Sequence, residues 1–151
     1  MAFRGTFDYQ LDDRNRVAIP PRYRDQFEAG AVLTTGLEPC IVMYTQDGFE
    51  QAAQTIEAIP EETAEGREAR RDFYANAWDA QKDGQGRVLI GAKLLAHAAI
   101  TKDVVVVGAG NALEIWDKET WENRDQTRAT ARREATAEIG ERRRARSLEE
   151  A

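Results

Sequence analysis

The feature that most constrains this sequence is a short motif that occurs twice. Asp12 and Arg16 enclose three residues and precede a β-branched and aliphatic run, and Asp83 and Arg87 repeat this pattern. Further matches join Gly36 to Gly108 and Tyr44 to Trp116 at a separation that is longer by one, so the second copy holds one extra residue. Self-similarity at a fixed period indicates repeated structural units. The sequence therefore predicts two copies of one unit, each with a charged turn between two strands.

The composition predicts a cytoplasmic protein. With 151 residues, 42% of them hydrophobic, the chain is long enough for one compact core. No apolar run approaches the ~20 residues that cross a bilayer, and the residues after Met1 lack the apolar stretch of a signal peptide. Cys40 is the single cysteine, so no intrachain disulfide can form, and its apolar surroundings predict a buried structural thiol.

The charge is unevenly distributed along the chain. The formal net charge is −6, which by itself argues against nucleic acid as a partner. Residues 1–24 nevertheless carry five Arg and three Asp, and residues 80–102 carry four Lys or Arg and one Asp. Residues 25–79 hold twelve acidic residues and three Arg. Because local fields steer anions, two repeated turns on one face would make that face basic on an acidic protein.

Hydrophobic patterning predicts short strands with a few helices. The alternation of Phe7, Tyr9 and Leu11 with polar residues is typical of a half-buried strand. In the first copy we expect strands over 6–11, 16–19, 31–35 and 40–44, and a short helix between Pro21 and Gly30. In the second copy we expect strands over 78–80, 87–90, 104–107 and 112–116, and a short helix over 92–99.

Two longer helices are expected between the copies. Asp47 is expected to cap a helix with Phe49 and Ile56 on its apolar face. Residues 60–63 would end it, and a second helix over 64–77 would bury Ala69, Phe73 and Ala77. After the second copy, Asp117 is expected to cap a helix that carries Trp121. Residues 117–151 hold nine basic and nine acidic residues, which favours a solvated helix or a frayed tail over a nucleic-acid-binding segment.

The repeated turns have two interpretations. Asn15 and Gly86 occupy the same position before the Arg, and both residue types tolerate a positive φ, so a left-handed backbone is expected there. Asp and Arg four residues apart could simply close a surface turn. Alternatively, Arg14, Arg16, Lys82 and Arg87 could face an anionic partner, since the Arg guanidinium fits phosphate oxygens or the guanine edge. Two copies in net positive segments favour the second interpretation.

No enzyme or metal site is expected, and no cofactor. His97 is the only histidine and has no cysteine cluster or second histidine for a metal. Gly108-Ala109-Gly110-Asn111 precedes a strand rather than a helix, so it predicts a hairpin turn and not a phosphate loop. Asp12 and Asp13 could bind a hard cation, but the neighbouring arginines oppose it. No nucleophile and base can be paired around His97.

Several segments resemble the bacterial MraZ proteins over about residues 1–122. They are Phe3-Arg4-Gly5, Leu11 to Pro20, Arg22-Tyr23-Arg24, Asp83 to Ile90, Leu113-Glu114-Ile115-Trp116 and Trp121. This sequence departs from the family where Asn15 replaces a usual Gly and Gly91-Ala92 replaces a common proline. The second departure would loosen the start of the following helix, so the second copy is expected to contribute less to binding.

The resemblance implies the fold of the AbrB and SpoVT regulators, a swapped-hairpin (double-split) β-barrel. We expect a mainly β, α+β fold from two tandem repeats, residues 6–50 and 77–122. Residues 51–76 would form a helical connector and residues 123–151 a charged tail, all within one structural domain. The family implies a ring-shaped homo-oligomer, often an octamer.

The resemblance also implies a DNA-binding transcriptional regulator, a repressor of the division and cell wall gene cluster, acting in the nucleoid at direct repeats in its own promoter. The binding turn carries over onto Asp12, Arg14 and Arg16, and the second signature onto Asp83 and Arg87. Arg14 and Arg16 would read bases, and Arg22, Arg24 and Lys82 would contact phosphates of the double-stranded DNA. Asp12, Asn15, Asp83 and Gly86 would brace the turns. The alternative is a self-assembling ring-shaped scaffold that binds acidic proteins.

Overall fold

The computed structural model describes residues 2–150, and the side chains of all of these except residues 125–127. The strands are β1 (Thr6–Gln10), β2 (Arg16–Ala18), β3 (Ala31–Thr35), β4 (Ile41–Thr45), β5 (Trp78–Ala80), β6 (Arg87–Leu89), β7 (Asp103–Gly108) and β8 (Leu113–Asp117). The helices are the 3₁₀-helix η1 (Pro21–Phe27), α1 (Gln46–Glu57), α2 (Ala64–Ala75), α3 (Ala92–His97), α4 (Lys118–Glu122) and α5 (Asp125–Glu150). Antiparallel sheet and helices together confirm the predicted α+β class.

The two repeats are interlocked by an exchange of strands. Six strands form one sheet in the order β1-β7-β8-β4-β3-β5, in which neighbouring strands run antiparallel. The first copy's hairpin β3–β4 is thus completed by β5 from the second copy, and the hairpin β7–β8 by β1 from the first. Because each copy lends a strand to the other, neither copy contains its own complete sheet. This is the swapped-hairpin arrangement that the sequence predicts.

A twofold relationship runs through both strand layers. Val17 of β2 pairs with Val88 of β6, its own counterpart in the repeat. In the large sheet Val42 of β4 pairs with Glu114 of β8, which are again counterparts, in the same alignment that joins Tyr44 to Trp116. A residue can face its own equivalent only across a twofold axis. The internal duplication therefore acts as a dimer within one chain.

The predicted barrel is not closed. β2 and β6 pair with each other, while β1 and β5 remain the edges of the six-stranded sheet. The ribbon is short because each strand has three residues, and Pro20 and Pro21, which follow β2, cannot donate to a ladder. The ribbon joins the sheet through its side chains instead: Val17 and Val88 are fully buried in the common core.

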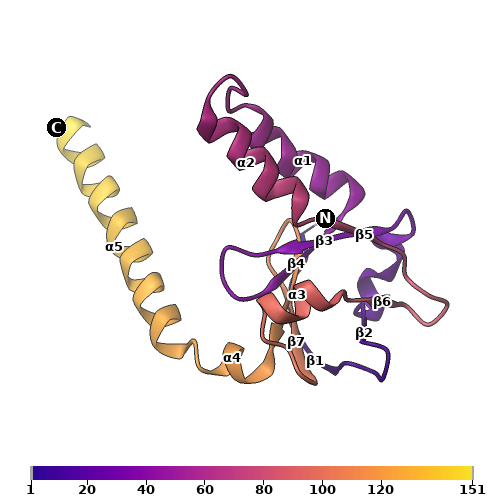
Figure 1. Ribbon diagram of the computed structural model, residues 1–151. Helices are drawn as coiled ribbons and strands as arrows, with labels where there is room; N and C mark the ends of the chain where they lie inside the picture. Colours follow the sequence, from indigo (N-terminus) through magenta and orange to yellow (C-terminus); the bar gives the residue numbers. More distant parts are fainter. Residues whose placement is uncertain (1, 151) are drawn as a thin grey trace. The chain divides into compact units, whose positions relative to one another are not determined.

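The connector between the copies forms a helical hairpin on β4, seen as a projecting arm in Figure 1. Thr45 caps α1, since its hydroxyl accepts a hydrogen bond from the Gly48 N–H at 2.9 Å. The prediction that Asp47 caps this helix is wrong: β4 runs directly into α1, so the cap lies two residues earlier and Asp47 lies in the first turn. Phe49 stacks on Phe73 of α2 at 4.8 Å between ring centroids, which holds the two helices together.

The second helix of the arm is shorter than expected. α2 ends at Ala75, so Ala77 lies beyond it, while Ala69 and Phe73 are half-buried. Thr63 caps α2 through the Gly66 N–H at 2.9 Å. The break at residues 60–63 lies where the sequence predicts it.

The structure divides into two compact units, residues 1–118 and 119–151. The first unit holds both repeats and the helical arm. In the second unit, α5 is a helix of 26 residues with mostly exposed side chains. The Trp121 ring lies beneath the guanidinium groups of Arg124 and Arg128, at 4.8 and 5.3 Å from its centroid. The tail is thus helical.

Substitution of Gly108 tests the exchange of the first strand. A Cβ at Gly108 would lie 2.3 Å from the backbone N of Arg4, and the Gly108 N–H donates to the Gly5 carbonyl at 2.8 Å. We expect Gly108→Ala to lower the free energy of unfolding by about 1–3 kcal/mol, because two backbone segments would have to separate. Urea denaturation measures this change. Gly84→Ala is the control, since nothing lies within 4 Å of its Cβ; equal losses would contradict the assignment.

Candidate nucleic-acid interface

Each repeated turn is closed by its aspartate. In the first turn, Asp12 Oδ1 accepts hydrogen bonds from the backbone N–H groups of Arg14 and Arg16, both at 2.9 Å. Asp12 Oδ2 accepts from Arg16 Nε at 2.7 Å. One carboxylate therefore binds the backbone of its turn with one oxygen and the arginine side chain with the other.

The second turn repeats these contacts atom for atom. Asp83 Oδ1 accepts from the N–H groups of Gln85 and Arg87 at 2.9 Å, and Oδ2 accepts from Arg87 Nε at 3.0 Å. The sequence motif is thus the signature of one turn geometry. The aspartate has to precede the arginine by four residues for both oxygens to be used.

The residue before each arginine has a left-handed backbone, as the sequence predicts. Asn15 has φ 59° and Gly86 has φ 77°. The Asn15 carbonyl accepts from the Ile90 N–H at 2.9 Å, and the Gly86 carbonyl accepts from the Ile19 N–H at 2.8 Å. Each turn thereby extends the β2–β6 ribbon by bonding to the strand that leaves the other turn.

The two turns are also joined through their charged side chains. Arg16 Nη1 lies 3.3 Å from Asp83 Oδ2, and Arg87 Nη1 lies 3.3 Å from Asp12 Oδ2. Each arginine therefore contacts both carboxylates. The four side chains are 25–29% exposed, so this Asp–Arg network lies at the surface with one side open to solvent.

The network lowers the pKa of both aspartates. The pKa of Asp12 lies below its ordinary value, chiefly because the carboxylate accepts the Arg16 backbone hydrogen bond, with the Arg14 N–H and the Arg16 side chain adding to this. The pKa of Asp83 is lowered in the same way, chiefly by the Arg87 N–H. Desolvation opposes both shifts. The carboxylates therefore stay ionised and the turns stay closed at neutral pH.

Two further predicted contact residues are held beside the turns. Arg24 Nε donates to the Ile19 carbonyl at 3.0 Å. Its guanidinium lies against Gly86 of the other copy, where an added Cβ would be 2.3 Å from Arg24 Nε. Lys82 forms an ion pair with Glu28 at 2.9 Å. Their positive charges are thus partly committed within the chain.

Arg22 lies next to the buried Tyr23. Its guanidinium is 5.3 Å from the centroid of the Tyr23 ring. The Arg22 side chain is exposed. Of the six basic residues predicted to contact DNA, the structure brings Arg16 and Arg87 into one network and places Arg24 against the second turn.

The tips of the two turns carry Arg14 and Gln85, which are counterparts in the repeat. Both side chains are exposed, and each residue is fixed by a backbone hydrogen bond to its aspartate. Neither tip side chain forms a hydrogen bond or ion pair within residues 12–16 and 83–87, all of which the structure describes. Sequence reasoning missed Gln85, although the alignment of Asp12 with Asp83 also aligns it with Arg14.

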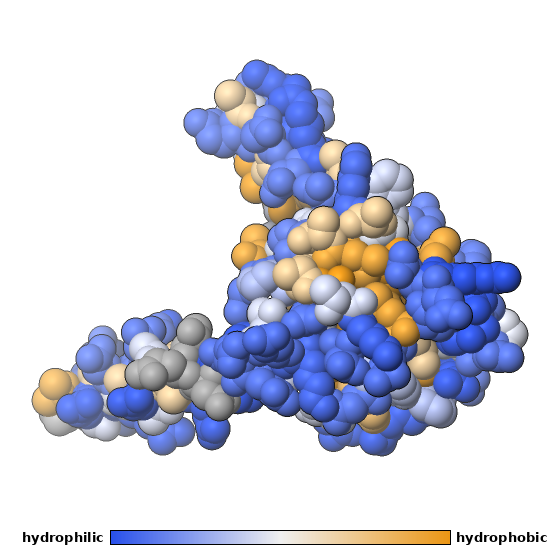
Figure 2. All heavy atoms as spheres, turned by 60° about the horizontal axis from the view of Figure 1, so that its bottom comes forward, coloured by the Kyte–Doolittle hydropathy of each residue, from blue (hydrophilic) through white to orange (hydrophobic). Residues whose placement is uncertain are grey.

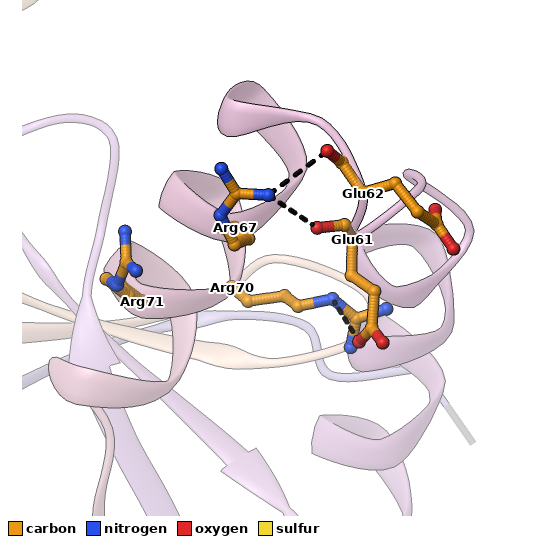
Figure 3. Close-up of a pocket in the computed structure, with 5 residues that line it drawn as sticks. All are labelled: Glu61, Glu62, Arg67, Arg70 and Arg71. Carbon is orange, nitrogen blue, oxygen red and sulfur yellow. Dashed lines mark hydrogen bonds and ion pairs between the residues drawn. The ribbon is translucent and has the colours of Figure 1, made fainter.

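A second group of arginines has a structural role. It borders a pocket of about 360 Å³ where α1 turns into α2 (Figure 3). Arg67 donates to the backbone carbonyls of Glu61 and Glu62, both at 3.1 Å, and Arg70 lies 4.0 Å from the Glu61 carboxylate. These arginines fasten the connection between the two helices. Their charge is balanced by the acidic residues of the same loop.

The described part of the chain shows neither a metal site nor a membrane span. Over residues 2–150, no three His, Cys, Asp or Glu side chains gather where they could hold a metal ion. His97 Nε2 lies 3.1 Å from the Glu38 carbonyl, so the ring holds a loop. None of the helices described is both long enough and apolar enough to span a bilayer.

The comparisons with known proteins agree with the internal repeat. The family described as "MraZ protein, putative antitoxin-like" matches residues 2–72 and again residues 73–143. The chain belongs to the MraZ family. The second MraZ match extends beyond residue 122, the expected end of the resemblance, and includes much of α5.

Two MraZ relatives cover most of the chain. The "Transcriptional regulator MraZ" of Thermobifida fusca (strain YX) is 40% identical over 119 residues, which is 79% of this chain and 83% of the relative. The "Transcriptional regulator MraZ" of Heliobacterium modesticaldum (strain ATCC 51547 / Ice1) is 32% identical over 137 residues, 91% of this chain and 96% of the relative. The chain therefore spans most of the length of both relatives.

Neutralising the two aspartates should alter the acid stability. Because their folded pKa values lie below the ordinary 3.8, they stabilise the fold above that pH, and this contribution is lost as the pH falls through the lower, folded pKa. We expect Asp12→Asn with Asp83→Asn to be less stable than the wild type at neutral pH, with the difference narrowing toward about pH 3. Thermal unfolding across this range measures it.

Asp13→Asn is the matched control, since Asp13 is exposed on the same turn. A constant difference between the double variant and the wild type at every pH would contradict the role given to the network.

Proposed function

We propose that this protein is a sequence-specific DNA-binding transcriptional regulator that reads DNA with the tips of the two turns. The observation that carries the proposal is the Asp–Arg network, which holds two equivalent tips rigidly and presents Arg14 and Gln85 to solvent. A preorganised turn loses little conformational freedom on binding. The names of the MraZ relatives support the regulatory role.

The tips differ in the base that each would recognise. The Arg14 guanidinium would donate two hydrogen bonds to the O6 and N7 atoms of guanine. The Gln85 amide would pair with N6 and N7 of adenine. Arg16 and Arg87 would mainly brace the turns, while their exposed edges add positive charge to the same face. Asn15 and Gly86 would allow the backbone path, and Asp12 and Asp83 would close it.

The remaining basic residues would position the duplex. Arg22, Arg24 and Lys82 flank the turns and would contact phosphates, which carry no sequence information but fix the register. Because much of this charge is paired within the chain, one copy would bind weakly. Several copies in a homo-oligomeric ring, for which the family resemblance suggests an octamer, would bind repeated elements together.

The family resemblance supports a particular target. The protein would act as a repressor in the cytoplasm, at the nucleoid, on direct repeats in the promoter of the division and cell wall gene cluster. No cofactor would be required, since the contact residues are arginine and amide side chains.

Fluorescence anisotropy tests the proposal with two duplexes of equal length. One carries the direct repeats upstream of the protein's own gene, and the other carries the same bases shuffled. We expect tight, salt-sensitive binding to the repeats alone, and Arg14→Ala should weaken it by about 1–3 kcal/mol per site. Gln85→Ala should relax the preference at a different base pair. Arg16→Ala should weaken all binding because it opens both turns.

Arg71→Ala serves as the control, because Arg71 lies on α2 and pairs with Glu68 at 3.2 Å, away from the turns. Equal binding to both duplexes would reduce the protein to an electrostatic binder. No binding to either would overturn the proposal and favour the scaffold that binds acidic proteins.

A further inference from the structure

The β3–β4 turn carries a leucine with no cover. Leu37 is 106% exposed, more than in an extended reference chain. The turn itself is well held: the Gly36 N–H donates to the Cys40 carbonyl at 2.9 Å, and His97 Nε2 lies 3.1 Å from the Glu38 carbonyl. A rigid turn therefore presents a single apolar side chain, which we call the Leu37 tip.

An apolar pocket of about 360 Å³ lies elsewhere on the same unit. We call it the α3 pocket; it is lined by Leu33, Trp78, Asp79, Leu89, Gly91, Ala92, Lys93 and Leu94. Leu89 and Trp78 are 59% and 50% exposed, which is high for side chains of their size. The view in Figure 2 shows hydrophobic residues gathered on one face of this unit, within a mainly hydrophilic surface. Exposed apolar patches of this kind mark contact sites.

The tip and the pocket lie at opposite ends of α3. His97, which contacts the turn of the Leu37 tip, is the last residue of α3, whereas Ala92 and Lys93 in the pocket are its first residues. In Figure 1 the β3–β4 turn and β6 correspondingly extend to different sides of α3. The tip of one chain therefore does not fill its own pocket.

We propose that the Leu37 tip of one copy inserts into the α3 pocket of a second copy. The charges beside the two features are complementary: Glu38 follows the tip, and the Lys93 ammonium lies 6.0 Å from the Trp78 ring centroid at the pocket. Because different surfaces meet, the contact is head-to-tail. Such a contact repeats from copy to copy and closes into a ring where the rotation permits. This assembly does not depend on DNA.

Sedimentation velocity of the full chain without DNA tests the proposal. We expect the wild type to be oligomeric, and Leu37→Asp and Leu89→Asp each to dissociate it to monomers. An equimolar mixture of the two variants should form dimers and no larger species. The Leu37→Asp copy still offers a pocket and the Leu89→Asp copy still offers a tip, so one contact can form and none can follow it.

Leu148→Asp is the control, since Leu148 is 79% exposed on α5 and could itself cover an apolar site. Thermal unfolding checks that each variant folds. A monomeric wild type, or an oligomer that Leu37→Asp leaves intact, would overturn the proposal. So would dissociation by Leu148→Asp in place of Leu37→Asp, because the C-terminal helix would then be the occupant.

The outcome is separable from the DNA proposal. The variant Leu37→Asp keeps both turns, so as a monomer it should still bind a duplex with one element, with lower affinity for repeated elements. Loss of assembly with retained sequence preference supports both proposals. Assembly without any DNA preference overturns the proposed function alone.

Discussion

The reciprocal contacts between two aspartates and two arginines hold the recognition face together. β2 and β6 have three residues each, a length at which a two-stranded ribbon is not stable by itself. Burial of Val17 and Val88 fixes the ribbon to the core, and the Asp–Arg network fixes its two ends. Since each carboxylate bonds to its own turn and to the arginine of the other, the turns close as one unit. The shape of one tip therefore depends on the sequence of both copies.

Duplication within one chain gives this unit a property that a pair of identical chains lacks. Identical chains would present identical tips around their twofold axis. Here the residues that make the turn, Asp, a positive-φ residue and Arg, are kept in both copies, whereas the tip residues differ as Arg14 and Gln85. Because the network bonds to the backbone of the tip residues, their side chains can change without loss of the turn. A symmetric scaffold can thus carry an asymmetric reading surface.

The sequence predicted the elements better than their partners. The constant separation between matching residues anticipated the twofold axis on which Val17 meets Val88 and Val42 meets Glu114. Alternation of apolar residues identifies the buried face of a strand but says little about which strand it joins, so the exchange of β1 and β5 came from the family resemblance alone. The cap of α1 was misplaced because Thr45 and Asp47 are both good capping residues, and the end of β4 decides between them. The bridging contacts of Arg16 and Arg87 also had no sequence signal, since each links an arginine of one copy to an aspartate of the other, far away along the chain.

The charge of the recognition face explains why assembly and DNA reading would belong together. The chain has a net charge of −6, and two arginines of this face are paired with carboxylates while Lys82 is paired with Glu28. An unpaired basic surface of the same size would bind any duplex tightly, since phosphate contacts dominate non-specific affinity. Pairing the charges lowers that background and leaves the tips to discriminate, at the cost of weak binding by each copy. Joining copies through surfaces other than the turns, as the Leu37 tip and the α3 pocket would do, restores affinity only where the DNA repeats the same element. Selectivity for repeated sites would then follow from weak individual contacts rather than from strong ones.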